Sequence, residues 1–482
     1  MSVERVLPKT LDYSDVLPLA VESKSRRRTF FPNNGGTYVS NGANIIRIDL
    51  SADALLDTQH SYLRFDVSGT AGSFGFDPAG GHAFISRLRV EQSGTILEDI
   101  QQYNRLMGAV VLPCQASDGA QGVRSMTEGQ YSAGRVLTGT AGTGNIATTT
   151  PINVTAISGG GGAGGGANGV GSMLQATGQT TNGLDQVTAG ASFTVCIPLT
   201  SGLLNSDKLV PLMLMSAPLT IEIELASAAT AMSGAAATVA YTISNVRYVA
   251  NLVEVGQDVS QQLRMLQEVS GGVLTLAGQT FRHFGASLLA ATNNTINVPA
   301  RVKSMKSIFF NCRGAGPDAI ANYDVGCGTT QSISSYQFKI GSVVYPPTPV
   351  VGPGAAATAT LRTSESVMEL EKAWGNVGSR NGMGKFTQCN NFYTNAAARV
   401  AATAAAGIPA DANRQSYAPF GLDMEAFQRV AIESGVNTAD RSLPISLVLE
   451  HAAAAAVSEI DVFVLCDALF YINSDGSMSV SI

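Results

Sequence analysis

Four histidines are the residues of this sequence best suited to binding a transition metal or to moving protons. They are His60, His82, His283 and His451, and no two of them fall at the close spacing of metal ligands. A cupin-type site needs a His-x-His pair with a glutamate and a further histidine, and the sequence contains no such pair. We therefore interpret these histidines as core or surface residues, and we expect neither a metal nor another cofactor.

Glu222 and Glu224 are the two carboxylates whose spacing suits acid–base chemistry. They share one face of a predicted strand, because side chains two residues apart on a strand point the same way. Two carboxylates on one face can flank a glycosidic bond. Such a pair is more often the solvent or interface face of a sheet, and that is the interpretation we favour, since function must be argued from a whole site.

The motifs that would indicate phosphate binding or a catalytic nucleophile are incomplete. The segment 378–386, GSRNGMGKF, misses the spacing of a P-loop, and Phe386 stands where serine or threonine would bind magnesium. The glycine run 159–166 lacks the strand-to-helix context of a dinucleotide-binding turn. No Gly-x-Ser-x-Gly elbow stands out among the many glycines and serines. None of these motifs indicates catalysis.

A basic cluster near the N-terminus is formed by Lys24, Arg26, Arg27 and Arg28. It belongs to residues 1–30, which contain two prolines and mixed charge, and chain ends of this kind are poorly ordered unless something ties them down. Either the cluster contacts an anionic partner or it is the charged part of a solvated tail. Both interpretations stay open at this point.

Charged residues make up only 14% of this 482-residue chain, against about 25% in an ordinary soluble domain. A chain so poor in charge has either a very large interior or a surface hidden in an assembly. We favour the assembly, because large uncharged surfaces tend to become interfaces. The net charge of −6 argues against a general nucleic-acid coat, which needs a basic face to neutralise phosphates.

The cysteines and the N-terminus indicate the compartment. Six cysteines are scattered without a CxxC pair, as expected for folding in reducing surroundings. Glu4, Arg5, Lys9 and Asp12 interrupt the first apolar residues, so we expect no secretory signal. No apolar run approaches the roughly 20 residues of a membrane-spanning helix. We therefore expect a protein that is not secreted.

Two stretches of alternating apolar and polar residues must position all these side chains. They are Leu219–Leu225 and Leu443–Leu449, and each predicts a strand with one buried face. An apolar run follows each stretch, Tyr241–Val255 after the first and Ile460–Ile472 after the second. The two stretches begin 224 residues apart. A repeat of this length is too long for a solenoid unit, and it fits two copies of a whole domain.

A second pattern also occurs once in each half, and it consists of a short strand, a glycine-containing turn and a helix. Its first copy is the strand Leu88–Val90, the turn Ser93–Thr95 and a helical stripe of Ile96, Ile100, Tyr103 and Met107. Its second copy is the strand Tyr336–Ile340, the turn at Gly341 and Ser342 and a stripe of Val367, Leu370 and Trp374. Two patterns in the same order favour tandem domains.

The sequence thus predicts two β domains joined by a helix, with short helices in the loops. One short helix is expected from Ser201, as its cap, to Leu209. Each domain is interrupted by a long loop of small residues, from which no core can be built. The predicted segments are an N-terminal arm (1–30), a first domain (31–256) with a glycine-rich loop at about 139–190, a linker helix (257–272), a second domain (273–475) with an alanine-rich loop at about 387–417, and a C-terminal tail (476–482).

The chain resembles the double jelly-roll major capsid proteins of tailless icosahedral DNA viruses, and within them the polinton-like virus and virophage group. The strand pairs that end each half carry this resemblance. The segment Tyr336–Pro349, YQFKIGSVVYPPTP, is also similar to a strand, Gly-Ser turn and Tyr-Pro segment of capsid proteins of that group. The glycine run and the alanine-rich loop depart from the family pattern.

The resemblance implies an all-β fold of two tandem antiparallel eight-stranded jelly rolls, each a sandwich of two sheets. It also implies a structural protein of the virion capsid that is not an enzyme. Three chains would form a pseudo-hexameric capsomer, and capsomers would tile an icosahedral shell together with penton and minor capsid proteins. Assembly would take place inside the host cell, with no small-molecule substrate. The arm would lie at the inner surface, where Lys24, Arg26, Arg27 and Arg28 could meet an internal membrane, the genome or a minor protein.

Two other classes of protein stay open. A two-domain jelly-roll glycan hydrolase would need an acidic cleft with clustered aromatic residues, and this chain has one tryptophan. A cell-surface β-sandwich adhesin would need a secretion signal and usually disulfides. The oligomeric state separates these classes, because an enzyme should be a monomer or dimer and a capsomer should be a trimer.

Overall fold

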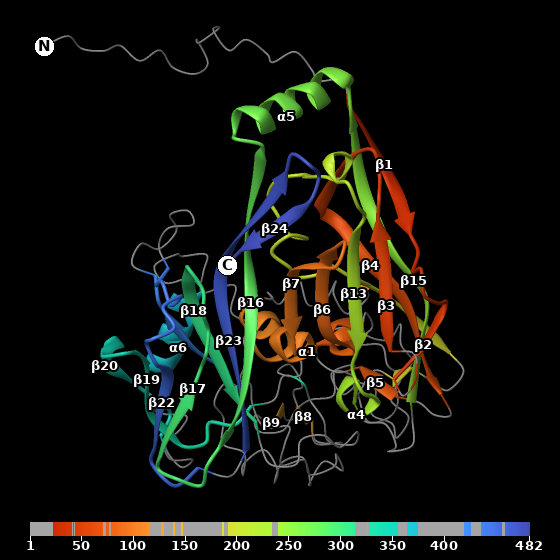
Figure 1. Cartoon of the computed structure of the whole chain (residues 1–482). Helices are drawn as coiled ribbons and strands as arrows, with labels where there is room; N and C mark the ends of the chain where they lie inside the picture. The colour runs from red at the N-terminus through yellow and green to blue at the C-terminus, as the bar shows by residue number, and fades with distance from the viewer. Residues whose placement is uncertain are drawn as a thin grey trace, which may run out of the picture.

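The computed structural model consists mainly of strands, which form two sandwiches side by side (Figure 1). It describes residues 23–40, 42, 44–70, 74–76, 79–115, 127–129, 138–139, 146–147, 186–187, 191–233, 240–313, 325, 328–354, 364–374, 419–425, 435–455 and 458–482. Within these residues, no helix is both long enough and apolar enough to cross a membrane.

The first sandwich has two four-stranded antiparallel sheets at its centre. One sheet has the order β1 (Ser23–Phe30), β15 (Ala240–Val255), β4 (Leu55–Thr70) and β11 (Ser192–Ile197). The other has the order β3 (Ile45–Leu50), β13 (Leu219–Leu225), β6 (Ile85–Gln92) and β7 (Thr95–Gln101). If the eight strands are numbered along the chain, one sheet has the order 1-8-3-6. The facing sheet has the order 2-7-4-5. This order is that of a jelly roll.

The second sandwich repeats the same order. Its first sheet is β16 (Val273–Leu288), β23 (Ser458–Asn473), β18 (Met305–Cys312) and β21 (Pro419–Asp423). Its second sheet is β17 (Asn293–Asn297), β22 (Ile445–His451), β19 (Ile333–Ile340) and β20 (Val343–Val351). These are again the first, eighth, third and sixth strands against the second, seventh, fourth and fifth. The chain is therefore a double jelly roll, and the predicted fold class is confirmed.

The repeated stretches of the sequence occupy equivalent places in the two rolls. The strands β13 and β22 are the seventh strand of each roll, and β15 and β23 are the eighth. In β13 the alternating Leu219, Ile221, Ile223 and Leu225 are all buried, as the pattern predicts. The sequence repeat therefore reflects a repeat of structure.

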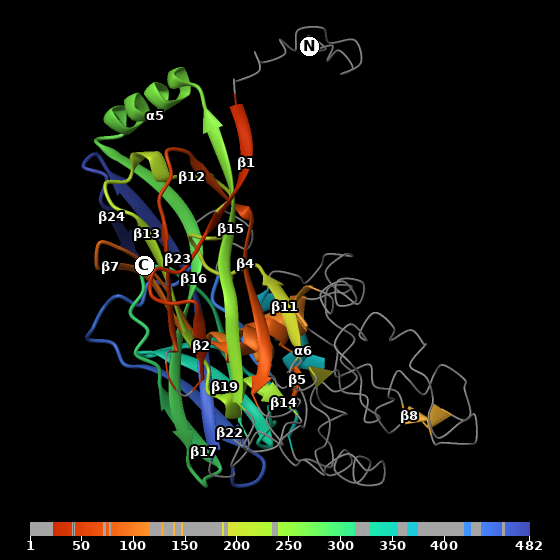
Figure 2. The same cartoon turned by 90° about the vertical axis from the view of Figure 1, so that its right-hand side faces the viewer.

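Two of the predicted helices are present. The helix α5 (Gln257–Val269) links the rolls and ends before Gly271 and Gly272, whose positive φ angles of 77° and 86° suit glycine. Figures 1 and 2 show α5 lying across one end of the molecule, beside the start of β1. The helix α6 (Ser364–Ala373) buries Leu370, as its predicted stripe requires.

Two other predicted helices are wrong. Ile96 and Ile100 lie on the strand β7, and helical turns begin only at Tyr103 with α1 (Tyr103–Arg105). Ser93 and Gly94 take left-handed φ angles of 49° and 82°, which is the backbone of a tight hairpin turn and returns the chain into β7. Residues 202–205 form turns in place of the helix predicted from Ser201.

The predicted N-terminal arm is wrong over Ser23–Phe30, because these residues form β1, the first strand of the first roll. The predicted tail is also part of a sheet, since β24 (Met478–Ser481) pairs with the end of β23. Residues 1–22, the alanine-rich loop and nearly all of the glycine-rich loop lie outside the described residues.

The cores show how the rolls are joined. The second roll has its own apolar core between its two sheets. The larger core fills the first roll and continues into the outer face of the second, where it includes Phe281 of β16, Phe309 of β18 and Phe463 of β23. Removing these rings from water stabilises the contact between the rolls as well as each roll. The two rolls therefore form one packed unit.

Candidate functional surfaces

The predicted basic cluster lies on the edge strand β1. This strand pairs with β15 along its whole length, and it is the last strand in the order of its sheet. Lys24, Arg26 and Arg28 point to one side of the sheet and Arg27 to the other, since side chains alternate along a strand. All four are exposed. The structure thus places them on one strand but divides them between its two faces.

Two of these arginines contact neighbouring strands. Arg26 Nη2 lies 2.7 Å from Glu254 Oε1 of β15, and both side chains are partly exposed. Arg27 Nη2 donates a hydrogen bond to the Tyr62 hydroxyl of β4 over 3.1 Å. Exposed contacts of this kind contribute at most about 1 kcal/mol each. They orient the side chains without removing their charge from the surface.

The other two basic residues have no ion pair within the described part of the chain. The guanidinium carbon of Arg28 lies 4.9 Å from the centre of the Phe30 ring, a cation–π contact at the end of the strand. Lys24 extends from the exposed end of β1. Charges on an edge strand also discourage unwanted pairing with other strands. The cluster therefore suits either this protective role or an anionic partner.

The edge strand of the second roll, β20, differs from β1 because it carries no charged residue. Val343 and Val351, at its two ends, are 52% and 44% exposed. Pro346, Pro347 and Pro349 lie between them and cannot donate backbone hydrogen bonds to a further strand. An apolar edge that cannot extend its sheet is suited to contact through side chains.

Each of the four histidines contacts a neighbouring polar group. His60 Nδ1 lies 2.8 Å from Asp57 Oδ2, and His82 Nδ1 lies 3.3 Å from the Tyr103 hydroxyl. His283 contacts Asp461, and His451 contacts Asn294 and a backbone carbonyl. Within the described residues, no group of three or more His, Cys, Asp or Glu side chains is placed to hold a metal ion.

Glu222 is an ion-pair residue of the sheet, and its oxygens are already occupied. Its Oε2 lies 2.6 Å from Arg47 Nη2, and its Oε1 lies 3.1 Å from Arg89 Nη1. These arginines stand directly opposite Glu222 on the strands β3 and β6. The hydrogen bond to Glu222 raises the pKa of Arg47 above its ordinary value. Glu222 and Glu224 therefore form no hydrolytic pair.

Glu98 lies buried where the two rolls meet. Its carboxylate accepts hydrogen bonds from the backbone N–H of Gly202 over 2.8 Å and of Leu203 over 3.4 Å. The hydroxyls of Ser201 and of Thr280, on β16 of the second roll, also donate to it. Burial raises the pKa of Glu98, although these donors favour the charged form. Glu98 thus joins a loop of the first roll to the first strand of the second.

The backbones also approach closely at this contact. A Cβ atom added to Gly278 of β16 would lie 2.3 Å from the carbonyl oxygen of Gly202. A Cβ atom added to Gly202 would lie 2.8 Å from the carbonyl oxygen of Gln279. The backbones of the two rolls can approach this closely only because both positions are glycine.

Asp461 is the centre of a second polar contact between the rolls. It lies on β23, 2.7 Å from His283 Nε2 and 3.2 Å from Nη1 of Arg105, which belongs to the first roll. Burial raises the pKa of Asp461, but the hydrogen bond from His283 and the charges of Arg105 and Arg313 outweigh it, and the pKa lies below its ordinary value. A carboxylate removed from water is thus balanced by cations from both rolls.

Gln92 of β6 attaches the C-terminal hairpin to the first roll. Its Nε2 donates to the carbonyl oxygens of Ala217, over 3.2 Å, and of Gly476, over 3.1 Å. Its Oε1 accepts a hydrogen bond from the backbone N–H of Met478 over 2.6 Å. Gln92 is only 3% exposed, so water does not reach this site. The Gln92 side chain therefore supplies the hydrogen bonds that water would otherwise make.

Sequence reasoning missed these residues between the rolls. A signal existed for Asp461, since a carboxylate inside the apolar run Ile460–Ile472 is rarely buried without a partner. Glu98, Arg105 and Gln92 carried no comparable signal, because their partners lie in a different part of the chain. The structure brings them together with β16 and β23, and it leaves the predicted basic cluster at an outer edge.

Three solved structures of viral proteins have a similar fold. The chain is similar to the PBCV-1 protein VP54 fitted into a reconstruction of the virophage Sputnik, with 9% identity, a TM-score of 0.57, and 98% of this chain and 99% of that chain covered. It is similar to the Faustovirus major capsid protein, with 8% identity, a TM-score of 0.56, and 94% and 91% covered. A Sputnik virophage structure gives 11% identity, a TM-score of 0.52, and 100% and 93% covered.

At these identities the likeness establishes the fold, and it agrees with the strand order described above. No protein-family model matches the chain, and no curated protein gives a significant match.

Proposed function

We propose that this chain is a major capsid protein, a structural protein without catalytic activity that tiles an icosahedral virion shell. The double jelly roll, shared over nearly the whole chain with the PBCV-1, Faustovirus and Sputnik structures, is the observation that carries the proposal. The scarcity of charge supports it, because much of the surface can then be buried between subunits. The virus would belong to the polinton-like virus and virophage group, with assembly inside the host cell.

The contact between the rolls suggests how chains associate into trimers. Within one chain, the first strand of the second roll, β16, packs against the fifth strand of the first roll, β7. The equivalent strands are β1 in the first roll and β20 in the second, and both are open edges. If β1 of one chain packs against β20 of the next, the same contact recurs between chains. Three chains then close a ring of six rolls, a pseudo-hexameric capsomer.

The exposed apolar residues support this arrangement. Phe31, next to β1, is 66% exposed, and Val343 and Val351 of β20 are 52% and 44% exposed. Side chains of this size are costly to leave in water and gain most from burial. A contact between the two edges would bury all three.

The basic cluster keeps its proposed role at the inner surface. Lys24 and Arg28 have no anionic partner within the described residues, and they lie on the edge strand that begins beside α5 (Figure 2). The contact with β20 would be made through Phe31 and the valines, and these two basic side chains, together with Arg26 and Arg27, would extend out of it to meet an internal membrane, the genome or a minor capsid protein. Penton and minor capsid proteins would be the other neighbours of the capsomer.

Measuring the mass of the purified protein in solution tests the proposal. Light scattering behind a sizing column should give three times the chain mass of 49.9 kDa, and the value should persist on dilution. Negative-stain images should show particles with hexagonal outlines. A stable monomer at all concentrations would overturn the capsomer, and screening against glycans would then test the hydrolase alternative.

A further inference from the structure

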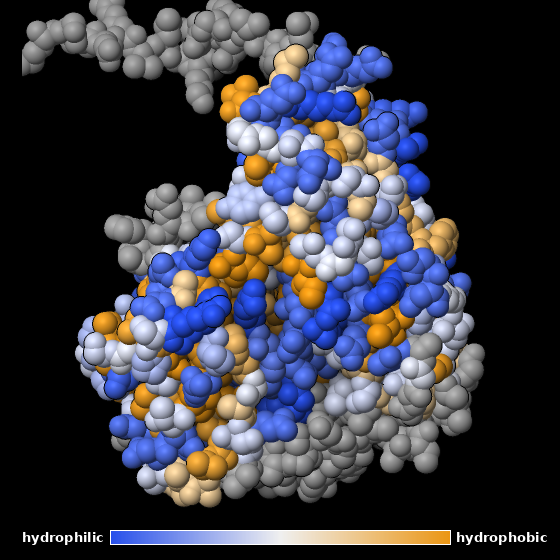
Figure 3. Space-filling view, viewed as in Figure 1, coloured by the Kyte–Doolittle hydropathy of each residue, from blue (hydrophilic) through white to orange (hydrophobic). Residues whose placement is uncertain are grey.

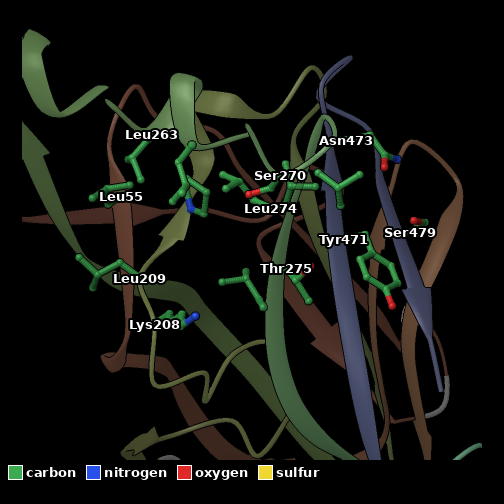
Figure 4. A pocket seen from close by; sticks show the side chains of 15 residues that line it. Leu55, Lys208, Leu209, Leu263, Ser270, Leu274, Thr275, Tyr471, Asn473 and Ser479 are labelled. Atoms are coloured by element: carbon green, nitrogen blue, oxygen red, sulfur yellow. The ribbon is translucent and has the colours of Figure 1, made fainter. Parts of the chain in front are cut away.

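A groove of about 900 Å³ opens beneath α5, at the end of the molecule where the two rolls are joined. Its volume lies within the range of small-molecule sites, roughly 300–1,000 Å³. Its walls come from α5, from β16 and β23 of the second roll, and from the segment around β12 (Val210–Pro211) of the first. Figure 4 shows these side chains pointing into the space between the elements.

Aliphatic side chains dominate the walls. They are Leu55, Leu209, Pro211, Leu263, Leu266, Val273, Leu274, Leu276 and Ile472. Leu209 and Leu266 remain 38% and 53% exposed, so the lip of the groove leaves apolar surface in contact with water. Such a surface favours an occupant that is flexible, unbranched and apolar.

Lys208 is the only charged residue among those that line the groove. Its side chain has no ion pair or hydrogen bond within the described residues, and its aspartate neighbour, Asp207, accepts a hydrogen bond from Gln59 instead. Figure 4 shows Lys208 and Leu209 on one side, with Tyr471, Asn473 and Ser479 across from them. The groove therefore combines an aliphatic wall with one cation and several neutral polar groups.

We propose that this groove binds a single long acyl chain that carries an anionic head group. The acyl chain lies along the leucines beneath α5, and the head group pairs with the Lys208 ammonium. An acyl chain needs no hydrogen-bond partner for its length, whereas a peptide would bring backbone groups that the aliphatic wall cannot satisfy. A free fatty acid and a phospholipid of a bilayer share this chemistry. The proposal does not depend on the capsid function.

Titration of the full-length protein with palmitate, below the concentration at which palmitate aggregates, tests the proposal. We expect saturable binding of one palmitate per chain by calorimetry. Shortening the fatty acid by two methylene groups should weaken binding roughly tenfold, because each buried methylene contributes a fixed free energy. The absence of saturable binding, or an affinity independent of chain length, would overturn the proposal.

Two substitutions localise the binding. Leu209→Glu places a carboxylate at the lip and should weaken palmitate binding at least tenfold, whereas Leu443→Glu, at a position that is also 38% exposed, should not. Lys208→Ala should weaken binding of palmitate roughly fivefold and leave binding of hexadecanol unchanged, with Lys339→Ala as the control. Equal effects of Leu209→Glu and Leu443→Glu would contradict a site in this groove. Unaltered unfolding midpoints will show that the variants remain folded.

Vesicles distinguish the two sources of the acyl chain. Flotation with phosphatidylcholine vesicles, with and without phosphatidylglycerol, should show binding that Leu209→Glu removes if the chain belongs to a bilayer. Binding of palmitate without binding to vesicles would assign the groove to a free fatty acid. The mass of the protein, measured in the same samples, tests the capsomer separately.

Discussion

Two buried carboxyl groups between the rolls, Glu98 and Asp461, have pKa values shifted in opposite directions. Burial dominates at Glu98, whose pKa is raised. At Asp461, cations from both rolls outweigh burial, and the pKa is lowered. A carboxyl whose folded pKa is depressed adds stability above its unfolded pKa, and this stability is lost as the pH falls through the folded value. Asp461 therefore makes the contact between the rolls sensitive to acid.

Replacing Asp461 by asparagine tests this at the residue scale. At neutral pH, Asp461→Asn should lower the free energy of unfolding by about 3 kcal/mol, because Arg105 and His283 then lose their anionic partner. The stability of the wild type should fall as the pH drops below about 4, and the variant should show a weaker dependence there. Urea unfolding between pH 3 and pH 7 measures both effects.

The exposed Asp53 provides the control for this substitution. Asp53→Asn should leave both the neutral-pH stability and the acid dependence near the wild-type values. Equal acid dependence in Asp461→Asn and the wild type would contradict the role given to Asp461.

Whole elements also depend on contacts that cross the molecule. The hairpin formed by β23 and β24 contacts the first roll through Gln92, which bonds Gly476 and Met478. Figure 1 shows β24 between the two rolls, close to β7. The C-terminal strand therefore reinforces the join between the rolls.

Gln92→Ala tests this contact at the scale of the element. It removes the side-chain acceptor of the buried Met478 N–H, a donor to the carbonyl oxygen of Ala217, and one of the two donors to that of Gly476, which Ser216 still contacts. This should cost about 1–3 kcal/mol of unfolding free energy. Amide hydrogen exchange in Met478–Ser481 should become faster. Gln59→Ala, which removes only an exposed hydrogen bond, is the control. If β24 amides stay as protected as in the wild type, the hairpin is held by other contacts.

Two of the edge strands, one in each roll, differ in character. The edge β1 is basic, whereas β20 has no charge and is interrupted by prolines. The two edges correspond, by their place in the strand order, to β16 and β7, which are joined inside the chain. A head-to-tail contact between chains would use β1 and β20 once in each chain, and the ring would close without leaving either of these two edges exposed.

Val343→Asp tests this contact at the scale of the molecule. A carboxylate at this 52% exposed position would have to leave water in the contact that also buries Phe31, so the trimer should dissociate at least tenfold more readily. Sedimentation velocity over a dilution series measures the change. Val269→Asp, 86% exposed at the end of α5 that leads into β16, should leave the trimer intact. A trimer unaffected by Val343→Asp would exclude β20 from the contact.

The alternation of apolar and polar residues was sufficient to predict the strands and their repeat. A strand with one buried face requires an apolar residue at every second position. Leu219–Leu225 and its counterpart were predictable for this reason, and so was the apolar stripe of α6. The stripe predicted through Ile96 and Ile100 failed because isoleucine spacing alone cannot distinguish a helix from a strand with a bulge. The β6–β7 register does shift, between Val90 and Glu91.

Composition and periodicity by themselves determined that this protein is a tandem β structure, poor in charge and without a recognisable catalytic motif. The tertiary structure alone decided that Lys24, Arg26, Arg27 and Arg28 belong to a strand, because their partners on β15 lie more than two hundred residues away in the chain. It also decided the join between the rolls and the groove beneath α5. Contacts between distant segments produce no periodic pattern in a sequence. The type of a residue indicates whether it is buried, but it does not indicate which other residue covers it.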